Sequence, residues 1–190
     1  MKQIPHAKGN PYELNRKDSR LKNYDYSRSG IYYVTFCTYE RICYLRDGDD
    51  ANLRYYNQGS LAEAFLNMMS VFNQNVEVLD YVVMPDHIHI LLSLNNDEAD
   101  KRYFEECHDL DITLDRAKVQ KDSLSSIIGH FKASITRHCR RQHLEMKWQK
   151  GFYDRVIRTN EELDSIKKYI RENESMWDVE RTVNPMGWPV

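Results

Sequence analysis

The sequence VEVLDYVVMPDHIHILLSL, residues 76–94, decides the fold of this 190-residue chain. Its first nine and last eight residues are rich in β-branched and aliphatic side chains, which predicts two strands. Pro85 and Asp86 lie between these runs and are typical of a tight turn. We therefore expect a β-hairpin with strands at 76–84 and 87–94.

His87 and His89 stand in the second strand of this hairpin. Side chains two residues apart in a strand point to the same face, so both imidazoles project together while Ile88 points to the opposite layer. Two ring nitrogens fixed on a rigid sheet can supply half of a metal site. The alternative is that both histidines lie on a solvated sheet face, and the pair alone leaves both interpretations open.

Segments before and after the hairpin also have the sequence patterns of strands and helices. Residues 31–39, IYYVTFCTY, are dense in β-branched and aromatic residues and predict a strand, as does the short run 152–157. Apolar residues at three- and four-residue steps predict helices at 60–72 and 123–143.

A last helix is predicted over residues 159–173, beginning at Thr159, which forms a Thr-x-x-Glu capping box with Glu162. The order is then β-α-β-β-α-β followed by a helix. This order predicts the α+β class with a ferredoxin-like arrangement, a four-stranded antiparallel sheet with two helices on one face. The opposite face is left for a functional site, which the last helix could cover.

Composition narrows the class of protein. Hydrophobic residues make up 41% of the chain and charged residues 29%, as expected for a globular protein. The longest apolar run, 89–94, is too short to span a membrane, and residues 1–20 lack a secretory signal. We therefore expect a cytoplasmic protein without membrane association. The cysteines form no Cys-x-x-Cys pair and are expected to be free thiols: Cys37, Cys43, Cys107 and Cys139.

The net charge of −2 hides an uneven distribution. Residues 1–28 hold seven Lys or Arg against three acids, and residues 121–150 hold seven against two. Residues 97–115 instead carry eight acids and two bases. We predict a basic N-terminal arm at 1–28, one globular domain at 29–180 with an acidic insertion at 95–121, and a tail at 181–190.

Basic and aromatic residues are interleaved from the helix at 123–143 into the segment behind it. Cations pair with phosphates and rings stack on unpaired bases, which is how proteins hold single-stranded nucleic acid. A solvated helix face is the alternative for the cations, and core packing is the alternative for the tryptophan. The residues predicted to contact nucleic acid are Arg20, Lys22, Lys132, Arg137, Arg140, Arg141, Lys147, Trp148 and Lys150.

Tyr169 and Asn173 lie one turn apart on the last predicted helix. Residues at this spacing share a helix face, so a phenol and a carboxamide lie side by side. An ordinary core-facing tyrosine is the alternative, since the chain contains 13 tyrosines. Tyr153 is the second candidate for a nucleophile, but its place in a predicted strand gives it no polar partner at that spacing.

Three segments of the chain resemble one family, in the same order. YVVMPDHIHILLSL, 81–94, resembles the histidine–hydrophobe–histidine strand of single-tyrosine HUH transposases of the insertion-sequence-200 type. WQKGFYDRVIRTNEELDSIKKYIRENESMW, 148–177, and SRLKNYDYSRSGIYYVTFCTYER, 19–41, resemble segments of the REP-associated tyrosine transposase branch. The resemblance covers most of the chain from Arg20 to Trp177 and leaves out the acidic insertion.

The resemblance implies a role for each site residue by its position. His87 and His89 match the paired metal ligands, and Asn173 matches the third ligand. Tyr169 matches the nucleophile, and the domain at 29–180 is then the catalytic domain. The metal expected at such a site is Mg²⁺ or Mn²⁺.

The implied function is a transposase, a metal-dependent endonuclease and strand transferase in DNA recombination. It would cleave single-stranded DNA next to hairpin or palindromic sequences through a 5′-phosphotyrosine. The resemblance leaves monomer and homodimer equally open. Two other functions fit the residues: a non-catalytic single-stranded nucleic-acid-binding domain of RRM-like fold, and a metal hydrolase in which the histidines activate water.

Two positions depart from the family pattern. Asp86 stands where asparagine usually precedes the first histidine, which adds a carboxylate near the predicted metal. Glu174 stands where proline often follows the helical asparagine, which lets the helix continue. Neither departure removes a predicted reacting group.

Overall fold

The structure is a computed structural model that describes residues 24–47, 56–96 and 122–177. The predicted tail and most of the predicted arm and insertion lie outside the described residues, as do Arg20, Lys22 and Cys107. The elements, in chain order, are β1 (Gly30–Cys37), η1 (Tyr39–Arg41), α1 (Asn57–Asn67), α2 (Met69–Phe72), β2 (Val76–Val83), β3 (His87–Leu94), α4 (Leu124–Arg141), β4 (Tyr153–Ile157), α5 (Asn160–Glu172) and η2 (Glu174–Met176).

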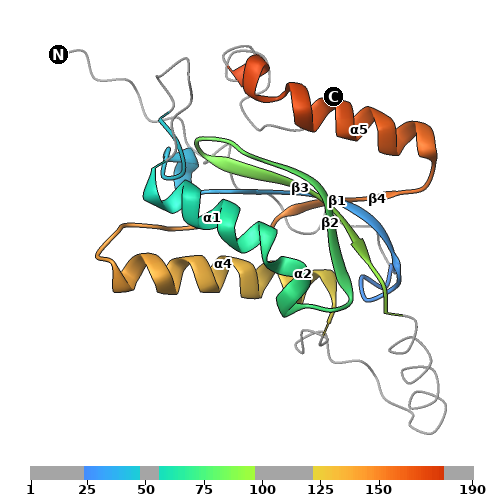
Figure 1. Cartoon of the computed structure of the whole chain (residues 1–190), viewed down its shortest axis with the longest axis horizontal. Coiled ribbons are helices and arrows are strands. Elements are labelled where there is room, and N and C mark those ends of the chain that lie inside the picture. Colours follow the sequence, from blue (N-terminus) through green and yellow to red (C-terminus); the bar gives the residue numbers. More distant parts are fainter. Residues whose placement is uncertain (1–23, 48–55, 97–121, 178–190) are drawn as a thin grey trace, which may run out of the picture.

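The four strands form one sheet in the order β2-β3-β1-β4, with all neighbours antiparallel. β2 and β3 form the predicted hairpin, and β1 lies between β3 and β4 (Figure 1). This strand order belongs to the ferredoxin-like arrangement, so the predicted α+β fold class is confirmed.

The helices divide between the two faces of the sheet. Figure 1 shows α1, α2 and α4 on one face and α5 on the other. β1 supplies both layers by alternation: Tyr32 and Phe36 belong to the core under α1 and α4, whereas Tyr33 belongs to a second core under α5. Across the strand pair, Ile88 joins the first core, as predicted, and Leu91 joins the second.

The helix starts follow their capping residues. Ser123 accepts a hydrogen bond from the backbone N–H of Ser126 and starts α4, and Thr159 accepts one from Glu162 and starts α5. The Glu162 carboxylate accepts the N–H of Arg158 at 3.0 Å. The predicted first helix is broken in two at Met68, between α1 and α2.

Two predicted boundaries shift in the structure. Tyr24, at the end of the predicted arm, packs against the core and contacts Tyr32 with 3.2 Å between the hydroxyl oxygens. Asn96, in the predicted insertion, is buried and its amide donates to Ser27 and Asp122 carbonyls at 2.7 and 2.9 Å. Within the described residues, none of the helices has the length and apolar character to cross a membrane.

Candidate active site

The two histidines of β3 face one another beneath α5. Their Nε2 atoms are 3.0 Å apart, and both side chains are fully buried. Across the strand pair, His87 lies opposite Cys37 and His89 opposite Thr35. The predicted projection of both imidazoles from one face is therefore present, but the face is covered rather than solvated.

Two hydroxyl groups of β1 surround the other nitrogen of His89. The Tyr33 hydroxyl and the Thr35 hydroxyl each lie 2.7 Å from His89 Nδ1, and the Tyr33 ring stacks on the imidazole with centroids 5.5 Å apart. Burial lowers the pKa of His89 well below its usual value, and the charges of His87 and Arg41 lower it further. His89 is therefore a neutral imidazole near neutral pH.

Helix α5 and the segment that follows it place two aromatic side chains against this pair. The Tyr169 ring lies 5.4 Å from that of His89, edge to face, and the Trp177 ring stacks on His87 at 6.0 Å. Asn173 caps the C-terminal end of α5, four residues after Tyr169 and four before Trp177, and is 1% exposed. Its side chain is therefore buried in the segment whose Tyr169 and Trp177 rings contact the histidines.

The donor set fits a small divalent cation. Ligands about 2.1 Å from a cation and at right angles to each other lie about 3.0 Å apart, which equals the separation of the two Nε2 atoms. Within the described ranges, no group of three or more His, Cys, Asp or Glu side chains is placed to hold a metal. The third ligand predicted from the sequence, Asn173, is of another residue type, and its side chain is buried.

Tyr153 occupies the same face of the sheet, one strand further away. It lies on β4 opposite Thr35, whose hydroxyl contacts His89. Burial raises the pKa of Tyr153, which disfavours the phenolate that a nucleophile needs. Tyr169 contacts His89 directly, whereas Tyr153 lies one strand further away.

Lys132 and Trp148, both predicted to contact nucleic acid, are used in packing. The Lys132 ammonium donates to the Gln149 and Gly151 carbonyls at 2.9 and 2.7 Å and lies 5.4 Å from the centre of the Phe36 ring. Trp148 packs on Phe36 and donates its indole N–H to the Lys132 carbonyl at 3.1 Å. Through these contacts the segment after α4 packs against the sheet.

The other described basic residues that were predicted to contact nucleic acid are exposed. They lie in two separate parts of the structure. The arginines Arg137, Arg140 and Arg141 lie on α4, on the sheet face opposite the histidines. Lys147 and Lys150 lie beside the end of β1: the Tyr39 N–H donates to the Lys147 carbonyl at 3.0 Å. Since Cys37 is opposite His87, this second group is the nearer to the site.

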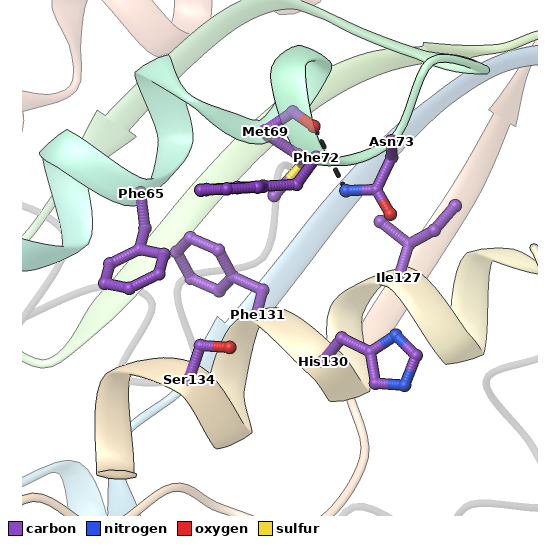
Figure 2. A pocket seen from close by; sticks show the side chains of 8 residues that line it. All are labelled: Phe65, Met69, Phe72, Asn73, Ile127, His130, Phe131 and Ser134. Carbon is purple, nitrogen blue, oxygen red and sulfur yellow. Dashed lines mark hydrogen bonds between the residues drawn. The ribbon is translucent and has the colours of Figure 1, made fainter. Parts of the chain in front are cut away.

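A pocket of about 270 Å³ lies on the face opposite the histidines. Figure 2 shows it between α1, α2 and α4, with Phe65 and Phe131 among its lining residues and the Asn73 amide bonded to the Met69 carbonyl. Its lining contains none of the predicted site residues, so it is separate from the candidate active site.

The structure adds residues that sequence patterns did not single out. Tyr33, Thr35 and Arg41 all contact the histidines or their partners. Alternation along 31–39 places Tyr33 and Thr35 on one face, but the register of β1 against β3 decides that this face meets the histidines.

Comparisons with known proteins agree with this architecture. No family model matches the sequence. A relative from Haemophilus influenzae, named only as an uncharacterized protein, is 24% identical over 168 residues, 86% of this chain and 91% of that protein. A solved structure of a REP-associated tyrosine transposase bound to a REP hairpin matches with a TM-score of 0.51 and 20% identity, over 90% of this chain and 92% of that one. This chain has the fold of a REP-associated tyrosine transposase.

Proposed function

We propose that this protein is a metal-dependent transposase that cuts and rejoins single-stranded DNA beside a hairpin, with Tyr169 as the attacking group. The observation that carries the proposal is the contact between the Tyr169 and His89 rings, beside a buried pair of facing imidazole nitrogens. The shared fold adds support, because the solved neighbour is a tyrosine transposase bound to a hairpin. The proposed substrate is therefore single-stranded DNA that folds back on itself.

His87, His89 and Asn173 would hold the divalent cation. Because all three donors are neutral, a bound cation keeps its full charge and supplies Lewis-acid polarisation of a phosphate oxygen. Imidazole ligands favour Mn²⁺ over Mg²⁺. The stacking of Trp177 on His87 and of Tyr33 on His89 fixes the two rings without occupying the space between their Nε2 atoms.

The proposed reaction begins with attack of the Tyr169 oxygen on phosphorus. The bond from that oxygen to phosphorus forms as the bond from phosphorus to the 3′ oxygen breaks. The Tyr169 hydroxyl loses its proton and the departing oxygen takes one up, which leaves a 3′-hydroxyl on one fragment and a 5′-phosphotyrosine on the other. The covalent link keeps the energy of the broken bond, so a 3′-hydroxyl can later reverse the step and join strands.

Access to this site requires a movement of α5. The side chains of His87 and His89 are fully buried and Asn173 is 1% exposed, so a phosphate reaches them only when the helix shifts from the sheet. Glu174, the first residue of η2 just after α5, forms an ion pair with Arg46, with 2.5 Å between Nη1 and Oε1. We infer that this ion pair holds the closed position and breaks when DNA enters.

The two other functions considered have less support from the geometry. An RRM-like binding domain stacks bases on an open sheet face, whereas α5 covers the face that carries the histidines. A hydrolase that activates water would give Tyr169 a structural role, and it predicts no covalent protein–DNA product. Detection of that product therefore separates the three functions.

The test uses purified full-length protein and single-stranded hairpin DNA labelled at its 3′ end, with and without Mn²⁺. Wild type, Tyr169→Phe and Tyr153→Phe are compared on a denaturing gel. We expect a labelled band at protein mass that needs Mn²⁺, disappears in Tyr169→Phe and persists in Tyr153→Phe. A band lost only in Tyr153→Phe would transfer the nucleophile to Tyr153, and tight binding without any band would favour a binding domain.

A further inference from the structure

Asp86 links Arg41 to the first histidine of the pair. Its carboxylate oxygens lie 2.6 Å from His87 Nδ1 and 2.8 Å from Arg41 Nε. Asp86 is 6% exposed and His87 is fully buried, so water screens these contacts weakly. Asp86, the acid that departs from the family pattern, thus contacts Nδ1 of His87, the ring nitrogen on the side away from His89.

The fold fixes this carboxylate through its own backbone. The Asp86 carbonyl accepts hydrogen bonds from the backbone N–H and the hydroxyl of Thr38, both at 2.9 Å. These bonds attach the turn between β2 and β3 to the end of β1. Asp86 therefore has two separable roles, a structural one through its carbonyl and another through its carboxylate.

Arg41 reaches the carboxylate from an unusual backbone conformation. Glu40 and Arg41 have φ values of 52° and 58°, in the left-handed region that side chains other than glycine rarely adopt. The Arg41 guanidinium then contacts both Asp86 and the Cys37 sulfur, the latter at 2.9 Å. Such strain persists only where surrounding contacts stabilise it, and these two contacts are available to do so.

We propose that Asp86 and Arg41 are positioning residues that hold His87 with its proton on Nδ1 and its Nε2 lone pair directed at the cation. A carboxylate only accepts, so His87 must donate from Nδ1. Arg41 balances the charge of the buried carboxylate. His89 differs, because its Nδ1 meets two hydroxyls that can each donate or accept. This inference rests on the proposed function, in which His87 is a metal ligand.

The test compares Asp86→Ala with Asp86→Asn in the full-length protein. Both variants keep the carbonyl bonds to Thr38, so both keep the structural role. Asparagine keeps one of the two acceptor oxygens, which holds the Nδ1–H form when it faces His87 rather than Arg41, whereas alanine removes both. Asp80→Ala is the matched control, because Asp80 is an acid of the neighbouring strand that pairs with Arg171 rather than with a histidine.

Two quantities are measured: Mn²⁺ affinity by titration with the metal alone, and the protonated ring nitrogen of His87 by nitrogen NMR of the metal-free protein. We expect Asp86→Ala to lower Mn²⁺ affinity about 10–100-fold. The proton of His87 should then no longer be held on Nδ1. Asp86→Asn should lose less than about tenfold and keep the proton on Nδ1, since an acceptor remains. Asp80→Ala should change neither quantity.

The outcomes separate this inference from the proposed function. Wild type with its proton on Nε2, or Asp86→Ala with unchanged Mn²⁺ affinity and ring protonation, would overturn the positioning role. Wild type that binds no Mn²⁺ but loses its Nδ1–H form in Asp86→Ala would support the positioning role and count against the metal-dependent function. Loss of Mn²⁺ affinity in the Asp80→Ala control as well would also overturn the inference, because the effect would then be unspecific.

Discussion

Lys132→Met tests whether this residue stabilises the fold or binds nucleic acid. The Lys132 ammonium donates to two backbone carbonyls, of Gln149 at 2.9 Å and of Gly151 at 2.7 Å. Methionine keeps most of the aliphatic stem that packs near Phe36 and Trp148, so the substitution removes mainly the charged group. The variant therefore isolates the two hydrogen bonds and the cation–π contacts.

The expected loss follows from these contacts. Hydrogen bonds to a charged group contribute roughly 1.5–3 kcal/mol each, and water can replace part of this at a half-buried side chain. We expect the free energy of unfolding to fall by about 2 kcal/mol. For a chain of this size, that loss lowers Tm by about 4–8 °C.

The assay pairs urea unfolding with DNA binding at several salt concentrations, and Arg137→Met is the matched control. Arg137 is an exposed residue of the same helix, so its substitution should change stability by less than about 0.5 kcal/mol. If Arg137 contacts a phosphate, the salt slope of its variant falls by roughly 0.7 for single-stranded DNA. Lys132→Met with native stability and a reduced salt slope would refute the packing role.

Other predictions concern the site itself. Mn²⁺ at about 100 times its Kd should stabilise wild type by about 2.7 kcal/mol in thermal unfolding, and His89→Ala should lose this gain; an equal gain in both would exclude the histidine site. Tyr33→Phe should weaken Mn²⁺ binding by less than tenfold, since Thr35 still contacts His89 Nδ1; calorimetric titration checks this. A double-mutant cycle of Arg46→Met and Glu174→Gln should give a coupling of about 0.5–1 kcal/mol, and additive losses would contradict the ion pair.

Periodicity alone was enough to predict which side chains share a face. Alternation along the hairpin placed His87 with His89, and helical spacing placed Tyr169 with Asn173; both relations are local properties of the backbone. The order of elements then restricted the fold to the ferredoxin-like arrangement, because few topologies join such elements without crossings. The fold class and the pairing of the two histidines are therefore encoded in short-range patterns.

Contacts between distant segments could not be predicted from local patterns in the same way. Lys132 and Arg137 belong to one basic helix, and nothing in their spacing tells that one cation is directed at loop carbonyls while the other is exposed. The role of Arg41 depends on two successive left-handed residues, which the sequence of non-glycine residues does not indicate. Both depend on where the chain turns, and this is decided by tertiary packing.

The two faces of the sheet are held unequally, and this bears on how the proposed site would open without unfolding of the protein. The larger core lies under α1 and α4, and it excludes α5, whose buried residues Ile166 and Ile170 belong to the smaller core. Ion pairs with partly exposed members also join α5 and the turn that follows it to the rest of the protein, among them Arg155 with Glu162, Arg171 with Asp80 and Glu174 with Arg46. Such pairs contribute little each, so lifting α5 costs less than disturbing the opposite layer. Under the proposed function, a tyrosine on the less firmly held layer would let DNA reach the histidines while the sheet keeps their geometry.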